Sequence, residues 1–401
     1  MSANDHLHLG IALDGAGWHP AAWRQPDARP AELLSPGYWT GLVQEAEAGL
    51  LDLVTIEDAL TLQSDELFAQ DERTDRVRGR LDAVLIAARV APVTSHIGLI
   101  PTAVTTHTEP FHLSKAVATV DFAALGRAGV RVQLAPRQDA ARHFGRREVP
   151  AIDVARINEP DQQQLLADGF DEAADYVEVL RRLWDSWEDD AEIRDVASGR
   201  FLDREKVHYI DFEGRWFSVK GPSITPRPPQ GQPVVAALGH SDIPYRLIGR
   251  AADLGFVTPH DAEQAATQVR QIDEHRLAAG RADETVHVWA DLVVVLDETE
   301  QAARDRLNHL NELTGAEYTS DALIFAGTPG QLADLLTEWS TAGLTGYRLR
   351  PATLPYDLTQ ITRGLVPELQ RRGRFRTAYP EKATLRSLLG LPRPANRYAT
   401  A

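Results

Sequence analysis

Short apolar runs alternate along the chain with longer amphipathic stretches. The short runs are typical of strands buried on both faces, and the longer ones repeat apolar residues at the three- and four-residue spacing of a helix. The predicted strands are Leu7 to Leu13, Leu51 to Ile56, His96 to Thr102, Val130 to Leu134, Val234 to Leu238, Gly255 to Thr258, Val286 to Leu296 and Gly346 to Leu349.

The predicted helices lie between these strands. They are Tyr38 to Ala48, Arg80 to Arg89, Pro110 to Leu125, Asp171 to Trp187, a helix opening after Ser241, Ala262 to Ala279, Glu298 to Leu313 and Gly330 to Ala342. This alternation predicts an α/β fold, a (β/α)8 TIM barrel with insertions. A doubly wound sheet is the alternative, but no Gly-x-Gly-x-x-Gly follows the first strand.

We expect one domain over residues 1–401. It is interrupted by a charged, then aromatic and proline-rich insertion at about 188–232, and a C-terminal extension starts at about 374. Barrel enzymes collect their functional residues at the carboxyl ends of the strands. Here those ends carry Asp58, Thr102 to Thr106, Arg131, Gln133 and Gly239 to Ser241.

Arg131 stands between Val130 and Val132 on a predicted strand. Strand neighbours point to opposite faces, so we expect Arg131 to point into the barrel and both valines outward.

The turn Gly239-His240-Ser241 joins an apolar strand to a helix start. Backbone N–H groups at such a turn favour a phosphate, although a plain N-cap explains the pattern equally well. A nucleophile elbow is excluded, because Gly-x-Ser-x-Gly requires glycine at Ile243.

Composition narrows the class of protein. The 401 residues are 43% hydrophobic and carry no cysteine, which excludes disulfides and thiolate catalysis and favours a cytoplasmic location. The net charge of −16 argues against nucleic acid as a partner. No apolar run is long enough for a membrane span.

His19 and His107 lie in loops at the predicted active face, and we consider them as catalytic acid–base groups; plain loop histidines are the alternative. His19, His107, His112 and His143 do not show a metal-ligand spacing, so we predict no metal site.

Several spaced motifs run along nearly the whole chain. They are Gly17 to Arg24, Thr105 to Phe111, Val120-Asp121 with Gly126-Arg127, Asp171 to Trp187, Phe212 to Pro222, Pro229 to Gly231, Val366 to Gly373 and Thr384 to Arg386. In this order they resemble the flavin-dependent monooxygenases of the bacterial-luciferase superfamily, in the branch of the nitrilotriacetate, dibenzothiophene-sulfone and long-chain-alkane monooxygenases.

The resemblance implies an FMN-dependent monooxygenase that uses O2 and reduced flavin supplied by a separate flavin reductase, and acts on a small organic substrate. It also implies a homodimer or higher homo-oligomer. Carried over residue by residue, Asp58, Thr102 and Thr105 would lie near the flavin ring, while Gly239, His240 and Ser241 would hold the phosphate.

Other positions depart from the family pattern. Val130-Arg131 stands for Trp-Asn, Leu134-Ala135 for Thr-Ser, Pro136 for a histidine, Phe170 for a tyrosine that could reach the phosphate, and Pro244 for a glycine. Arg131 would compensate for these lost polar contacts by binding the flavin. Alternatively, it binds an acidic substrate or a carboxylate of the protein.

The alternatives are therefore a barrel subunit that binds flavin weakly or has lost catalysis, and an oxidoreductase that uses a deazaflavin. The loops expected to shape the substrate pocket, Ser64 to Gly79 and Thr314 to Ala326, are short and polar or mixed. They favour a compact, partly polar substrate over a long alkyl chain.

Overall fold

The computed structural model describes residues 6–64, 66 and 68–399. At its centre, parallel strands close into a barrel in the order β1-β2-β3-β4-β9-β10-β11-β13, and β13 pairs back with β1. The eight barrel strands are β1 His8–Leu13, β2 Leu53–Ile56, β3 Gly98–Val104, β4 Gly129–Gln133, β9 Val234–Leu238, β10 Leu254–Val257, β11 His287–Leu296 and β13 Gly346–Pro351. The predicted (β/α)8 barrel is confirmed.

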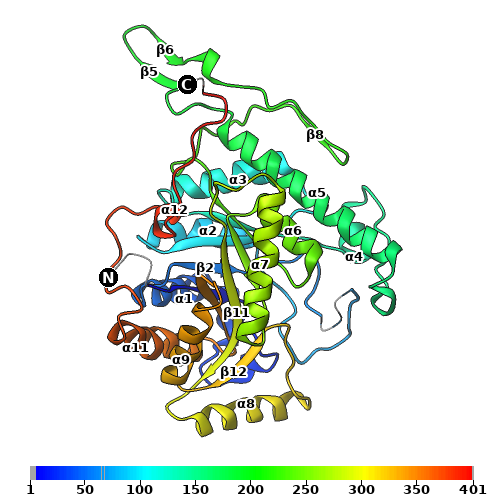
Figure 1. Ribbon diagram of the computed structural model, residues 1–401, viewed down its shortest axis with the longest axis vertical. Helices are drawn as coiled ribbons and strands as arrows, with labels where there is room; N and C mark the ends of the chain where they lie inside the picture. Colours follow the sequence, from blue (N-terminus) through cyan, green and yellow to red (C-terminus); the bar gives the residue numbers. More distant parts are fainter. Residues whose placement is uncertain (1–5, 65, 67, 400–401) are drawn as a thin grey trace.

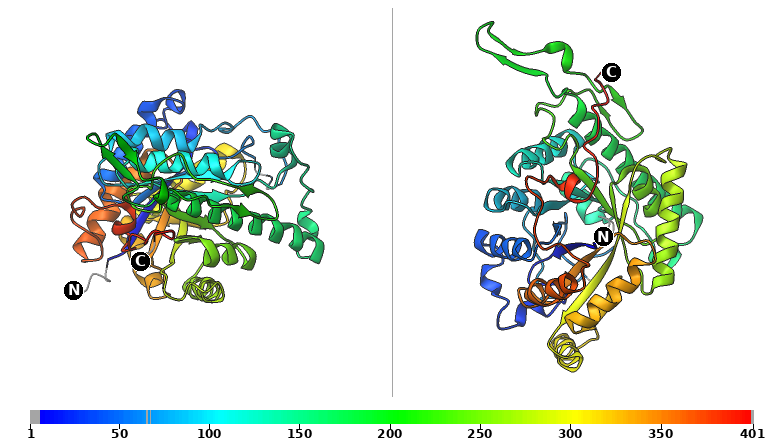
Figure 2. Two further views of the ribbon diagram at one scale, coloured as in Figure 1. Left: turned by 90° about the horizontal axis from the view of Figure 1, so that it is seen from above. Right: turned by 60° about the vertical axis from the view of Figure 1, so that its left-hand side comes forward.

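Helices surround the barrel (Figure 1; Figure 2, right). They are α1 Pro36–Ala48, α2 Ala83–Val90, α3 Pro110–Ala123, α4 Gln138–Phe144, α5 Pro160–Asp185, α6 Asp242–Ala251, α7 Ala262–Ala278, α8 Glu300–Thr314, α9 Pro329–Ser340, α10 Tyr356–Gln360, α11 Val366–Arg371 and α12 Leu385–Leu388. Short 3-10 turns cover Ala22–Arg24, Pro30–Glu32, Ala91–Val93, Val154–Arg156 and Arg204–Lys206, and a π turn, Ile361–Leu365, joins α10 to α11.

We predicted eight helices for the eight strands, and the assignment of one helix to each strand was wrong. Both α8 and α9 lie between β11 and β13, and the helix that follows the last strand is the α10–α11 segment, which we had not predicted. An additional strand, β12 (Leu323–Gly327), pairs with the carboxyl half of β11, whose amino half pairs with β10. This strand lies in a segment that we had expected to be a loop.

The predicted insertion forms two hairpins, β5 (Glu192–Asp195) with β6 (Arg200–Leu202), and β7 (Phe212–Glu213) with β8 (Ser218–Val219). The β5–β6 hairpin projects away from the barrel, and the C-terminal segment runs beside its base (Figure 1). Neither hairpin contributes a residue to the described lining of the cavity at the barrel mouth.

The main apolar core fills the layer between strands and helices. Val130 and Val132 belong to it and are almost fully buried, as the alternation along β4 predicts. Side chains on the opposite face of the strands point into the barrel, where the polar groups described below lie.

Candidate active site

A cavity of about 380 Å³ opens at the carboxyl ends of β1 to β4. Its lining comes from the segments after these strands, from the turn before α2, from α4 and from Tyr318, which precedes β12. This is the end of the barrel where such enzymes place their active sites. The volume lies within the range of small-molecule pockets.

Hydrogen bonds tie the lining segments together. Trp23 donates its indole N–H to the Asp75 carbonyl at 2.9 Å, and Arg137 donates to the Leu62 carbonyl at 3.3 Å. Both loops expected at the pocket do contribute, since Ser64 and Tyr318 line the cavity. The cavity is thus shaped by contacts between segments far apart in the sequence.

Three charged groups in the wall, Asp14, Arg80 and Arg137, are paired within the chain. Arg80 binds the Asp14 carboxylate through two nitrogens, at 3.0 and 2.5 Å, and the Gln63 amide donates to the same carboxylate at 3.2 Å. Arg137 binds Asp139 in the same two-pronged way. Paired guanidinium groups give the wall polarity without a large local excess of charge.

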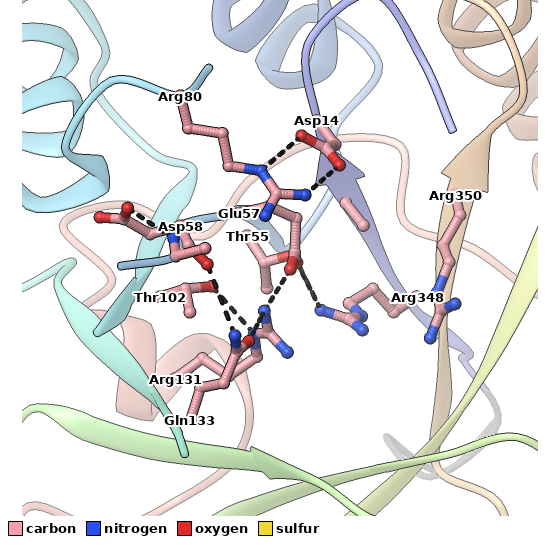
Figure 3. Close-up of polar contacts among 12 residues, drawn as sticks. Asp14, Thr55, Glu57, Asp58, Arg80, Thr102, Arg131, Gln133, Arg348 and Arg350 are labelled. Carbon is pink, nitrogen blue, oxygen red and sulfur yellow. Dashed lines mark hydrogen bonds and ion pairs between the residues drawn. The ribbon is translucent and has the colours of Figure 1, made fainter. Parts of the chain in front are cut away.

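Below the cavity, the barrel interior holds a network of buried ion pairs (Figure 3). Asp291 is fully buried and binds both Arg348 and Arg350. Burial alone would raise the pKa of Asp291, but the two arginines lower it further than burial raises it. Arg350 also binds Asp321 at 2.6 Å and lies over the Trp18 ring at 4.5 Å, so the network reaches the cavity.

Arg131 belongs to this network and points into the barrel, as predicted. Its Nε donates to Thr102 Oγ1 at 3.0 Å, and its Nη2 donates to Glu57 and, at 3.0 Å, to Gln133 Oε1. Of the partners that we considered for Arg131, the structure supplies a carboxylate of the protein itself.

Asp58 serves as a backbone cap. Its carboxylate accepts hydrogen bonds from the N–H groups of Ala59 at 2.7 Å and Ala83, at the start of α2, at 2.9 Å. Burial raises the pKa of Asp58 in spite of these bonds. Its neighbour Ala59 lines the cavity, so Asp58 lies at the edge of the cavity and fixes the loop there.

The threonines of the third strand lie beside the network. Thr102 is fully buried, and its hydroxyl is used by Arg131. Thr105, directly after the strand, donates its backbone N–H to the Gln133 carbonyl at 2.9 Å. Phe170 of α5 and Leu134 are both partly buried and pack against the main core.

His19 lines the cavity, but both of its ring nitrogens are engaged. Nδ1 accepts from the Ala21 N–H at 3.1 Å, so Nε2 carries the proton and donates to Asn311 Oδ1 at 3.1 Å. Burial lowers the pKa of His19. It lies 4.8 Å from the Tyr318 ring and holds that side of the cavity in place.

His107 is not among the described residues that line the cavity; its ring stacks on Phe144 at 5.6 Å, and its φ is 74°. Its Nε2 is buried without a hydrogen-bond partner. Burial, and then the charge of Arg147, lower the pKa of His107. The structure does not bring the two candidate acid–base histidines together.

The Gly239-His240-Ser241 turn lies apart from this cavity, at the start of α6. Ser241 is the N-cap residue, yet its hydroxyl makes no capping bond, and Gly239 has no room for a Cβ, which would lie 2.8 Å from Tyr245. His240 binds Thr258 at 3.0 Å, and burial lowers the pKa of His240.

A second hollow, of about 460 Å³, lies between this turn and α7. Asp242, Asp261 and Glu263 line it, and among the described residues that line it there is no arginine or lysine. The uncapped Ser241 hydroxyl suits a phosphate, whereas the carboxylates oppose one.

Sequence reasoning missed the ion-pair network beneath the cavity, in which Asp291, Arg348 and Arg350 are central. The available signal was the alternation of charged and apolar residues on β13, where Arg348 and Arg350 flank Leu349. Asp14 and Arg80 were also missed, because their pairing joins residues 66 positions apart.

Over residues 6–64, 66 and 68–399, no group of three or more potential metal ligands comes together. Within the same ranges, no helix has the length and apolar character needed to cross a membrane.

A parallel (β/α)8 barrel with a cavity open at its carboxyl face defines an enzyme of the barrel class. Residues 19–322 match the family model of the luciferase-like monooxygenases, and the chain belongs to this family. It is a flavin-dependent monooxygenase.

Two relatives match along nearly their whole length. The N-acetyl-S-(2-succino)cysteine monooxygenase of Bacillus subtilis (strain 168) is 30% identical, with 99% of each chain covered. Nitrilotriacetate monooxygenase component A of Aminobacter aminovorans is 29% identical, over 100% of this chain and 99% of the relative. The crystal structure of a long-chain alkane monooxygenase superposes with a TM-score of 0.83, at 24% identity and 96% coverage of both chains, which supports the fold.

The family implies a flavin, and the residues around the cavity fit a flavin ring. Trp18, Trp23 and Tyr318 provide aromatic surface, and the Gln133 amide provides a hydrogen-bond donor. For a phosphate, the chain offers the Ser241 hydroxyl and the start of α6, but no cation in the adjoining hollow among the described residues. The described residues therefore offer more suitable contacts for the flavin ring than for its phosphate.

Proposed function

We propose that the chain is the oxygenase of a two-component system, which takes reduced FMN from a separate flavin reductase and uses O2 to oxidise a compact, partly polar organic molecule. The cavity over β1 to β4 carries this proposal, because its walls combine aromatic rings with paired charges. One relative is component A of a monooxygenase, which supports the existence of a second component.

The chain has no nicotinamide-binding fingerprint after its first strand, which supports an external source of reducing equivalents. Bound reduced flavin would supply the electrons that activate O2. The protein would bind the ring between Trp18 and Gln133, and the loops tied by Trp23 and Arg137 would exclude water. We place Asp58, Thr102 and Thr105 on the ring side, and Gly239, His240 and Ser241 on the phosphate side.

The test combines the pure chain, NADH, FMN, O2 and a flavin reductase. We expect a nearly colourless protein that binds reduced FMN in the micromolar range and oxidises a candidate substrate only when the reductase is present. Oxidation of NADH by the pure chain would contradict the two-component assignment. We also expect a homo-oligomer, which sedimentation velocity measures.

A second candidate is a barrel subunit that binds flavin too weakly for catalysis. The acidic hollow beside Ser241 and the apolar contact of Leu134 with the α5 region favour it. Failure to bind either FMN or reduced FMN at millimolar concentration would establish this alternative.

A further inference from the structure

Gln133 lies where the ion-pair network meets the cavity. It is the last residue of β4 and lines the cavity, while its amide oxygen contacts Arg131 within the barrel. This contact fixes the orientation of the amide: its oxygen faces Arg131 and its nitrogen faces the Asp58 carbonyl, as Figure 3 shows.

The orientation follows from donor and acceptor chemistry. A guanidinium group has five N–H donors and no acceptor, so the amide atom 3.0 Å from Arg131 Nη2 must be Oε1. The amide nitrogen must therefore point the other way. Arg131 is itself immobilised by Glu57 and by Thr102, and only 2% of its surface is exposed.

The amide nitrogen carries two N–H donors. One is directed at the Asp58 carbonyl at 3.5 Å, the outer limit of a hydrogen bond, and the other has no acceptor among the described residues. A donor at the cavity wall favours a ligand atom that accepts a hydrogen bond.

Resting on the proposed function, we infer that Gln133 is a flavin-binding residue whose amide N–H donates to an acceptor atom of the flavin ring, and that Arg131 is the positioning residue that holds this orientation. This gives a role in ligand binding to Arg131, which is buried beneath the cavity. The guanidinium acts on the ligand through Gln133 rather than by touching a phosphate.

Titration of flavin fluorescence with FMN and with riboflavin tests this inference. Gln133→Met, which removes the donor, should weaken both flavins about fivefold, the value of one neutral hydrogen bond. Gln133→Glu keeps the shape and retains an oxygen for Arg131, but it turns an acceptor toward the ring. It should weaken both flavins at least tenfold and equally, because the contact is with the ring.

Gln138→Glu is the matched control, since it adds the same charge to α4 at the same end of the barrel but at a residue that does not line the cavity. It should bind both flavins like the parent, and thermal melting checks that each variant folds. Arg131→Met combined with Glu57→Gln removes the guanidinium that orients the Gln133 amide. This double variant should lower the affinity for both flavins as much as Gln133→Met does.

Normal flavin binding by both Gln133 variants would overturn the inference while leaving the proposed function intact. So would a loss of FMN affinity without loss of riboflavin affinity, which would place the contact at the phosphate. A parent protein that binds neither flavin would overturn the proposed function, and this inference with it.

Discussion

Both ends of the barrel carry buried charges and histidines. They differ in how fully their polar groups are hydrogen-bonded within the chain. At the amino end, the Asp52 carboxylate accepts from His8 at 2.8 Å, from the Leu9 N–H at 2.8 Å and from Arg376 of the C-terminal extension. At the carboxyl end, the Gln133 amide and the Ser241 hydroxyl retain unused hydrogen-bonding capacity.

The C-terminal extension explains much of this difference. It covers the amino end, where Tyr379 donates to the Leu51 carbonyl at 2.6 Å and His287 contacts the Leu389 carbonyl at 2.8 Å. The amino end is closed by the chain itself and contributes to stability. The carboxyl end leaves polar groups for a ligand, as the division of labour in barrel enzymes predicts.

The largest expected effect comes from breaking the amino end. Asp52→Ala leaves Arg376 and His8 without their shared partner, and removing one member of a buried ion pair costs about 3–5 kcal/mol. Chemical denaturation should show this loss, while the FMN affinity of the folded protein stays unchanged. Asp242→Ala is the control, since its pair with His275 is exposed and should have little influence on stability.

Acidification should also act on the amino end. Burial, and then His8, lower the pKa of His287 to about 4, from an ordinary value of 6.5. The unfolded chain therefore takes up this proton first, so stability is complete above pH 6.5 and falls as the pH decreases to 4. At about 1.4 kcal/mol per unit, the total is about 3 kcal/mol.

His287→Gln should remove this part of the pH dependence between pH 6.5 and 4, measured by urea denaturation at a series of pH values. A variant that loses stability over this window as steeply as the parent would show that another group is responsible.

Ser241→Asp tests the phosphate side of the carboxyl end. A carboxylate about 4 Å from a phosphate at an effective dielectric near 20 costs about 4 kcal/mol, which solvent reduces to about 1–3 kcal/mol. FMN should bind at least tenfold more weakly, more so at low salt, while riboflavin is nearly unaffected. Folding should persist, because aspartate is as good an N-cap as serine. An unchanged FMN-to-riboflavin ratio would show that the phosphate lies away from Ser241.

The smallest effect is expected at the acidic hollow beside this turn. Asp261→Gln removes one of its three carboxylates and should tighten FMN about twofold to threefold at low salt, with no change for riboflavin. Equal FMN affinity at low and high salt in both proteins would place the phosphate away from this hollow.

The strands were predictable because buried parallel strands are mostly apolar, and β11, which is buried throughout its length, has only His287 and Asp291 as ionisable residues. The amino-terminal half of α5 was missed, since its residues Pro160 to Asp168 are mostly polar and show little apolar periodicity. The direction of Arg131 followed from alternation along β4. Its partner Glu57 did not, because it lies 74 residues away and their contact depends on barrel closure.

A crystal structure with bound FMN tests the central claim most directly. The claim is that the flavin ring occupies the cavity over β1 to β4, with Trp18 on one side and the Gln133 amide within hydrogen-bond distance. We predict ring density in this cavity. Density for the ring in the hollow between α6 and α7, with the cavity over β1 to β4 left to solvent, would contradict the claim.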